Sequence, residues 1–115
     1  MQFTIEHDRF ETEAEAIAAF TADGLHVVSV DFPAQTNGDH WHDFASRLCI
    51  VSGRLRLTES DSGEMCDLGP GTVVIAPARI LHREQTDGYR AVVGLAVDPA
   101  TLSQPILKSP AELHS

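Results

Sequence analysis

Three histidines stand in two blocks of the chain that are bounded by glycines and prolines, and this arrangement limits the fold more than any other feature. His40 and His42 form a His-x-His pair in the first block, and His82 lies in the second. Because side chains alternate across a β-strand, a His-x-His pair on a strand points both imidazoles to one face. A third histidine from a distant strand can complete a facial set of nitrogen ligands. The pattern therefore predicts a β-fold with a transition-metal site on these three residues.

Short apolar runs separated by turn signals make up most of the chain. Strands are expected at residues 3–5, 25–32, 40–52, 54–59, 64–68, 72–76, 81–86 and 89–97, with a polar loop at residues 33–39. The turn signals between them are Gly53, residues 61–63, residues 69–71 and residues 87–88. Short strands at this spacing favour a sandwich or barrel, so an all-β fold is expected.

One helix is expected ahead of most of these strands. Thr12 and Glu15 have the Thr-x-x-Glu spacing of a capping box, and Gly24 suits the position just past the helix end. Ile17 and Phe20 lie three residues apart and can share one buried face. The chain is then one compact domain, with an edge strand and helix in residues 1–24, a β-barrel in residues 25–97 and a proline-containing tail in residues 98–115.

The net charge of the chain limits the classes of partner that it can bind. Eight basic and seventeen acidic residues give a net charge of −9, which repels nucleic acid and anionic membranes but favours cations, including metals. No signal-peptide pattern follows Met1 and no apolar run approaches the length of a membrane span, so a cytoplasmic protein is expected. Cys49 and Cys66 stand in apolar strand-like segments, where a free cysteine acts as a small hydrophobe. We therefore expect the protein to bind a small molecule and to bind neither nucleic acid nor a membrane.

The two histidine blocks resemble the paired motifs of the cupin family, whose members are small jelly-roll β-barrels with a metal site in the barrel mouth. The family motifs read G-x5-H-x-H-x3-4-E-x6-G and G-x5-P-x-G-x2-H-x3-N. The spacings that fit are those from His42 to Gly53, from Gly71 to Pro77 and from Pro77 to His82. The resemblance covers most of the chain. It implies a cupin jelly-roll β-barrel with a short N-terminal helix and, as in many small cupins, a homodimer.

Four positions depart from these motifs. Gly38 is separated from His40 by one residue instead of five. Ser46 stands at the position of the glutamate ligand, Arg79 at that of a glycine and Thr86 at that of an asparagine. Three histidines without the glutamate resemble the three-histidine cupins, including thiol dioxygenases. That likeness implies one divalent transition metal, with Zn, Fe, Ni, Mn and Cu not distinguished, and open positions for water, dioxygen or a bidentate substrate.

Strand alternation predicts which side chains accompany the histidines. If His40 and His42 face the lumen, Phe44, Ser46, Leu48 and Ile50 share their face, whereas Trp41, Asp43, Ala45, Arg47, Cys49 and Val51 face the other way. On the later strand Glu84 shares a face with His82, which makes Glu84 the candidate catalytic acid–base group. Two alternatives for Glu84 stay open. It can ligate the metal, or it can fix the tautomer of a ligating histidine.

Two further residues carry expectations of their own. Trp41 is expected at a dimer interface or packed against the second sheet, because its parity opposes the lumen. Arg79 is expected to be a solvated turn residue, the alternative being a gate at the barrel mouth that attracts an anionic ligand.

Three functions remain open after these observations, because one fold hosts many activities. The first is a metal-dependent enzyme, either an oxygenase or a lyase/isomerase, that acts on a small acid or sugar derivative. The second is a non-catalytic module that binds or senses a small polar molecule. The third is a metal-free structural cupin in which the histidines form a hydrogen-bonded polar pocket.

Overall fold

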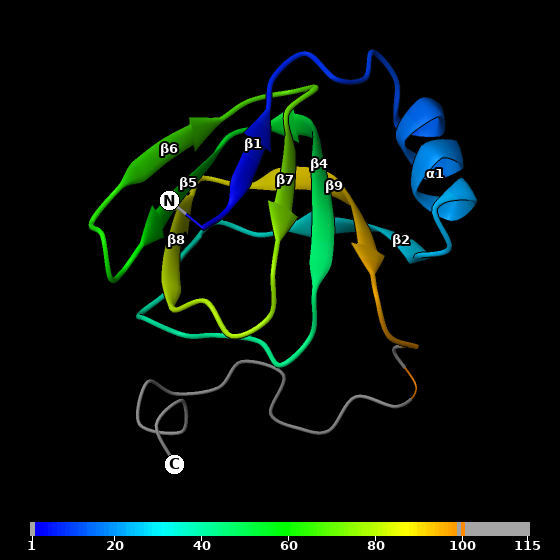
Figure 1. The fold of residues 1–115 in the computed structure, drawn as a ribbon. Coiled ribbons are helices and arrows are strands. Elements are labelled where there is room, and N and C mark those ends of the chain that lie inside the picture. Colours follow the sequence, from blue (N-terminus) through cyan, green and yellow to red (C-terminus); the bar gives the residue numbers. More distant parts are fainter. Residues whose placement is uncertain (1, 99, 101–115) are drawn as a thin grey trace.

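The computed structural model describes residues 2–98 and 100, which form two antiparallel β-sheets and one short helix (Figure 1). The elements are β1 (Thr4–Glu6), α1 (Glu13–Ala22), β2 (His26–Phe32), β3 (Gln35–Thr36), β4 (Ser46–Gly53), β5 (Leu55–Glu59), β6 (Met65–Leu68), β7 (Val73–Ala76), β8 (His82–Thr86) and β9 (Tyr89–Leu95). Within this part of the chain, α1 is too short and too polar to cross a membrane.

Hydrogen bonds group the strands into a sheet of five and a sheet of four. The order is β1-β7-β4-β9-β2 in the first sheet and β3-β8-β5-β6 in the second. The N-terminal strand β1 therefore belongs to the same sheet as the central strands, where it pairs with β7. The predicted all-β jelly-roll architecture is confirmed, in the form of two facing sheets.

The expected strands are present, with one correction and one addition. Strand β4 begins at Ser46, so the strand expected from residue 40 is wrong over its first six residues. The addition is β3, a two-residue strand within the expected polar loop that pairs with β8. The tail expected in residues 98–115 lies, beyond Ala100, outside the described residues.

Apolar side chains pack on both faces of the five-stranded sheet. Between the two sheets lie Phe3, Ile50, Leu55, Leu57, Leu68, Val74, Ile80, Tyr89 and Ala91. Between the sheet and α1 lie Ala16, Phe20, Cys49, Val73 and Val92. Neighbours in β4 thus point to opposite sides, as the alternation predicted, and Cys49 is a buried apolar residue as expected.

Helix α1 begins and ends as predicted but buries a different pair of residues. The hydroxyl of Thr12 accepts the backbone N–H three residues ahead at 3.2 Å, and Gly24 follows the helix end with φ +82°. The buried positions are Ala16 and Phe20, four residues apart, whereas Ile17 is 36% exposed. The predicted pairing of Ile17 with Phe20 is wrong, because the small side chain of Ala16 lets the helix lie against the sheet.

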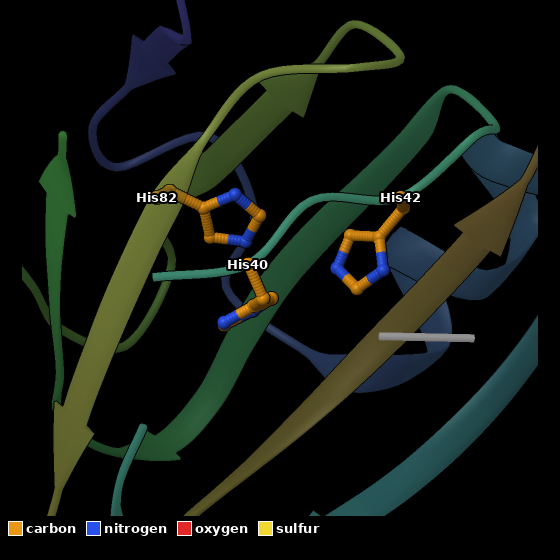
Figure 2. Close-up of side chains that lie close together, drawn as sticks. All are labelled: His40, His42 and His82. Carbon is orange, nitrogen blue, oxygen red and sulfur yellow. The ribbon is translucent and has the colours of Figure 1, made fainter. Parts of the chain in front are cut away.

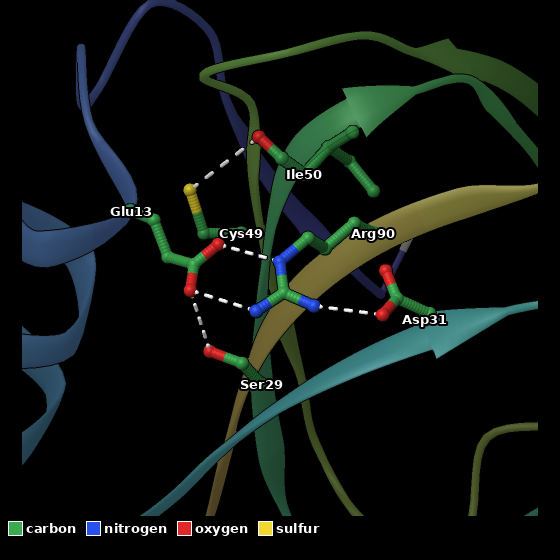
Figure 3. A network of polar contacts seen from close by, with 6 residues as sticks. All are labelled: Glu13, Ser29, Asp31, Cys49, Ile50 and Arg90. Atoms are coloured by element: carbon green, nitrogen blue, oxygen red, sulfur yellow. Dashed lines mark hydrogen bonds and ion pairs between the residues drawn. The ribbon is translucent and has the colours of Figure 1, made fainter.

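A polar network fixes α1 over β2 and β9 (Figure 3). The guanidinium of Arg90 on β9 donates to both carboxylate oxygens of Glu13, at 2.7 and 3.0 Å, and to Asp31 on β2 at 2.9 Å. The hydroxyl of Ser29 donates to Glu13 at 3.1 Å. The hydrogen bond from Arg90 holds the pKa of Glu13 below its usual value. The first residue of the helix is therefore anchored to two strands.

Two glycines of the recognised motifs meet a steric demand of this fold. Gly53 follows a bulge in β4 and has φ +79°, and a Cβ there would lie 2.4 Å from the carbonyl oxygen of Gly88. Gly71 has φ +86°, and a Cβ there would lie 2.9 Å from the carbonyl oxygen of Phe10. Any other residue would be strained at both positions, so glycine is required where the chain turns back between the sheets.

Candidate metal centre

The two histidine blocks meet through an isolated backbone bridge. His40 donates its N–H to the carbonyl of His82 at 2.8 Å, and His82 returns a bond to the carbonyl of His40 at 2.9 Å. The chain leaves the four-stranded sheet at this bridge and joins the five-stranded sheet at Ser46. This crossing between sheets is why no continuous strand runs from residue 40. The bridge nevertheless places the His-x-His pair beside His82.

The three imidazoles converge on one point inside the molecule (Figure 2). One ring nitrogen from each of His40, His42 and His82 lies within 4.8 Å of the others. The ring centroids are 4.3 Å apart for His40 and His82, and His42 lies 5.4 and 5.3 Å from them. His42 is half-buried and stacks on Phe44, whereas the other two rings are buried. The residues predicted as ligands are therefore neighbours in space.

Backbone carbonyls orient two of the three rings. The Nδ1 atom of His40 lies 2.8 Å from the carbonyl oxygen of Gly38, and the Nδ1 atom of His82 lies 2.8 Å from that of Ile80. A carbonyl oxygen only accepts, so each Nδ1 carries the proton and each Nε2 of the neutral ring presents a lone pair. The Nε2 atom of His40 is buried and has no hydrogen-bond partner within the described residues. Metal-ligating histidines are commonly held in this way through their other nitrogen.

Glu84 lies between the two buried rings. Its Oε1 atom is 3.5 Å from Nε2 of His40 and 3.4 Å from Nε2 of His82, and its side chain is 17% exposed. Burial alone would raise the pKa of Glu84, but the hydrogen bonds and positive charge that His40 and His82 supply as protonated rings outweigh burial and lower it to about 2. Burial alone would lower the pKa of His40, but Glu84 and the carbonyl of Gly38 raise it. The cluster therefore holds a carboxylate that stays ionised at neutral pH.

Neutral imidazoles that face an ionised carboxylate repel it unless a cation lies between them. With both Nδ1 atoms donating to the backbone, the Nε2 lone pairs of His40 and His82 face the carboxylate oxygen of Glu84. Three acceptors facing one another repel, and a proton on an imidazole or a metal ion relieves that repulsion. The donor set of imidazole nitrogens and carboxylate oxygen suits a first-row divalent metal. The residues present thus fit the metal that the sequence predicts.

The cluster lines a cavity of about 440 Å³ between the two sheets. Phe44, Ser46 and Leu48 line it, so the inward orientation predicted for this face is correct. Most of the wall is apolar, and it includes Phe3 from before β1 and Tyr89 from β9. None of the described residues that line the cavity is lysine or arginine. Burial, and then the charge of Glu84, raises the pKa of Tyr89, so its hydroxyl stays protonated.

Trp41 and Arg79 lie away from this cavity and contact each other. Trp41 is 3% exposed within the single chain, so it offers no surface for a dimer interface. The guanidinium carbon of Arg79 lies 4.8 Å above the ring of Trp41, a cation–π contact. Arg79 is an exposed turn residue with φ +66°, a conformation that favours the glycine of the family motif. It does not line the cavity, which disfavours the alternative of a gate.

The other histidines among the described residues take no part in the cluster. His7 and His26 are exposed, and His114 lies outside the described residues. Ser46 lines the cavity with a hydroxyl where the family motif has a carboxylate. The hydroxyl of Thr86 donates to the carbonyl of Arg54 at 2.6 Å, a structural bond at the end of β8.

Comparisons with solved structures assign the fold. A DUF861 family protein from Thermotoga maritima has a TM-score of 0.59 and 17% identity, over 81% of this chain and 98% of that one. The WlaRB TDP-quinovose 3,4-ketoisomerase of Campylobacter jejuni has 0.58 and 15%, over 76% and 72%. Bacillus subtilis oxalate decarboxylase, which has Mn(II) centres, has 0.56 and 21%, over 77% of this chain and 25% of that one. No protein-family sequence model and no curated protein sequence matches the chain. These neighbours are cupin-type structures, so the chain has the cupin fold.

Two features of the site were not predicted from the sequence. The carbonyls of Gly38 and Ile80 orient the imidazoles, and each stands two residues before the histidine that it holds. A repeated contact at this spacing depends on local backbone geometry, for which the sequence carries no signal. The apolar wall is the second feature, because residues such as Phe3 and Tyr89 reach it from elements far apart in the chain.

Proposed function

We propose that this protein is a metal-dependent cupin that holds one divalent transition metal on His40, His42 and His82 and acts on a small molecule in the adjoining cavity. One observation carries the proposal. The buried Nε2 of His40 has no hydrogen-bond partner among the described residues and points into a cluster of two further imidazoles and an ionised carboxylate. A protein without a metal or proton to place there would leave a buried acceptor unsatisfied, which is costly.

The chemistry proposed is of the oxygenase or the lyase/isomerase type. When bound, a divalent metal would supply Lewis acidity, and a redox-active one would also supply electron transfer. The chain contributes a cluster with two rings that are oriented by backbone carbonyls, together with a largely apolar wall beside it. A protonated Tyr89 adds a hydrogen-bond donor to the cavity lining. The cupin neighbours include an isomerase and a decarboxylase, which supports an enzymatic role.

The cavity lining indicates the kind of molecule that would bind. At about 30 Å³ for each water-sized group, 440 Å³ holds about 15 such groups, which is the size of a small metabolite. The histidines and Glu84 give the lining one polar cluster, Gln35, Asn37, Ser46 and Tyr89 add single polar groups, and most of the remaining wall is apolar. With no lysine or arginine among the described lining residues, the cavity offers a phosphate neither an ammonium nor a guanidinium partner. The proposed ligand therefore has one polar, metal-binding head and an apolar body, rather than several charges.

Metal analysis tests the metal claim directly. Protein purified without a histidine tag is expected to hold about one divalent metal per chain at neutral pH, measured by elemental analysis and by titration with Zn²⁺, Ni²⁺ and Fe²⁺. His42→Ala and His82→Ala should lose that metal. The matched control is His26→Ala, which removes an exposed imidazole from β2 and should bind as wild type does. If wild type and His82→Ala bind all three ions equally poorly, the cluster is a polar pocket without metal.

Ligand screening tests the second claim. The metal-loaded protein is expected to gain thermal stability with an aryl-alkyl carboxylic acid and to gain little with a sugar phosphate of similar size. The physical reason is that the apolar wall rewards burial of the aryl group, whereas a sugar phosphate would bury its hydroxyl groups against that wall and find no cationic side chain there beyond the metal. A clear preference for the sugar phosphate would contradict the proposed ligand class.

A further inference from the structure

The carboxylate that the cupin motif supplies from one strand is present here on another. Ser46 on β4 has no carboxylate, but Glu84 on β8 points its carboxylate at the histidine cluster. We propose that Glu84 is a fourth ligand of the metal and replaces the glutamate that is missing at position 46. This inference rests on the proposed metal binding and adds a ligand to it.

The distances around Glu84 match those between neighbouring ligands of a metal ion. Two ligand atoms that each lie about 2.1 Å from a tetrahedrally coordinated metal are about 3.4 Å from one another. The Oε1 atom of Glu84 lies 3.5 Å from Nε2 of His40 and 3.4 Å from Nε2 of His82. These separations are long for hydrogen bonds but suit atoms that share one ion.

The backbone holds Glu84 in this position from both sides. On one side β8 pairs with β5, where Glu84 lies opposite Leu57. On the other side the carbonyl of Glu84 accepts the N–H of Asn37 at 2.8 Å. Because Glu84 and His82 are two residues apart on one strand, their side chains leave the sheet on the same face. The carboxylate is therefore placed by a strand in the middle of a sheet rather than by a loop.

The geometry disfavours the two other roles open to Glu84. A carboxylate that orients a ligating histidine binds the nitrogen turned away from the metal. In His40 and His82 that nitrogen is Nδ1, and the carbonyls of Gly38 and Ile80 already accept from it. An acid–base group needs an oxygen that is free to reach the substrate, whereas the Oε1 atom of Glu84 lies against two of the ring nitrogens that would hold the metal. Ligation accounts for both contacts together.

The experiment compares Glu84→Gln with Asp39→Asn, a matched control. Asp39 is the residue next to His40, but its carboxylate accepts from Ser60 at 2.8 Å and Arg83 at 3.2 Å, outside the cluster. Both changes remove one negative charge near the histidines, so a purely long-range charge effect would weaken binding similarly in both. Zn²⁺ affinity is measured by competition with a chelator, and the Co²⁺-loaded proteins are compared by visible absorption.

Loss of Glu84 as a ligand has a distinct signature. Glu84→Gln should lower Zn²⁺ affinity by more than the roughly 10–100-fold expected for an outer partner, and should change the Co²⁺ spectrum. Asp39→Asn should stay within a few-fold of wild type and keep its spectrum. Adding Ser46→Glu to Glu84→Gln should restore part of the affinity, because it returns a carboxylate to the position of the family motif. Should Glu84→Gln not fold, Glu84→Asp, which keeps the charge but shortens the reach, should show the same losses in smaller measure.

The outcomes separate this inference from the proposed function. If wild type binds metal and Glu84→Gln, or Glu84→Asp in its place, binds equally tightly with an unchanged Co²⁺ spectrum, Glu84 is not a ligand, while the three-histidine site stands. If wild type and Asp39→Asn bind no metal, the proposed function fails and this inference with it. An equal loss in Glu84→Gln and Asp39→Asn would show that charge, and not ligation, is what Glu84 contributes.

Discussion

The two faces of the five-stranded sheet are made by the same strands but differ in how they are covered. On the outer face, Cys49 of β4 lies opposite Val73 and Val92, and all three are at most 2% exposed beneath α1. In the neighbouring row of the sheet, on the inner face, Leu48 and Val93 line a cavity of about 440 Å³. Both faces are apolar, so their composition does not explain the difference.

The difference between the two faces follows from the element that packs against each of them. A helix lies directly on the outer face and fills the space with Phe20 and Ala16. The inner face is opposed by a sheet whose strand β8 turns His82 and Glu84 toward it. Polar groups that need a partner keep that space from closing, since apolar packing against them would leave them unsatisfied. The space for a ligand therefore comes from the element across the sheet.

Truncation of one side chain on each face tests this contrast most strongly. Phe20→Ala should lower the free energy of unfolding by about 3–5 kcal/mol, because it leaves a hole in a packed layer. Leu48→Ala should cost only about 1–2 kcal/mol, because its side chain already borders open space. Urea denaturation of both variants measures the two values. Equal losses would mean that the inner face is packed as tightly as the outer one.

Acid should lower the free energy of unfolding, because it protonates Glu84 on the strand that faces the inner side of the sheet. Folding lowers the pKa of this carboxyl from 4.5 to about 2, so its contribution is fully present above pH 4.5 and is lost as pH falls toward 2. At about 1.4 kcal/mol per pKa unit the contribution to the metal-free protein is about 3 kcal/mol. Unfolding measured between pH 5 and pH 2 should show this loss in wild type and a flatter profile in Glu84→Gln. Parallel profiles would assign the acid sensitivity to other carboxyls.

Bound metal should reverse the way in which the stability of the protein depends on pH near neutral pH. The raised pKa of His40 means that, without metal, its contribution is fully present below pH 6.5 and is lost as pH rises through the raised value. Metal competes with that proton, so Zn²⁺ at 100 times its Kd should add about 2.7 kcal/mol at pH 8 and much less at pH 5.5. Thermal unfolding with and without Zn²⁺ measures both slopes. If Zn²⁺ stabilises the protein equally at both pH values, the ion binds at a site other than the histidine cluster.

The smallest effect is expected at the edge of the sheet. β2 is an edge strand, and its Val28 continues the inner row of the sheet with 45% exposure. The homodimer expected from the family resemblance would cover this edge, since Trp41 is already buried within one chain. Sedimentation equilibrium at micromolar concentration should give about twice the chain mass of 12.5 kDa, and Val28→Lys should lower that value without unfolding the chain. A wild-type protein that sediments as a monomer would contradict the predicted homodimer.

Local signals were enough to predict most of the strands and the helix. The helix start follows from the side chain of Thr12, and the turns at Gly53 and Gly71 follow from backbone angles that other residues avoid. These are interactions among residues close together in the chain, or limits on a single residue. The burial of Ile17 and Trp41 was predicted less well, because burial depends on which element lies opposite.

For the site, residue spacing was enough to predict the candidate ligands and the pairing of His40 with His42, because a spacing of two residues has the same consequence in any extended segment. The packing of the folded chain determined that His82 joins them through an isolated backbone bridge beside β8 and that Glu84 faces two of the rings. It also decided that the space beside them is apolar and without basic residues among its described lining. The physical reason is that alternation orders side chains within a strand, whereas contacts between strands depend on the register of the whole sheet.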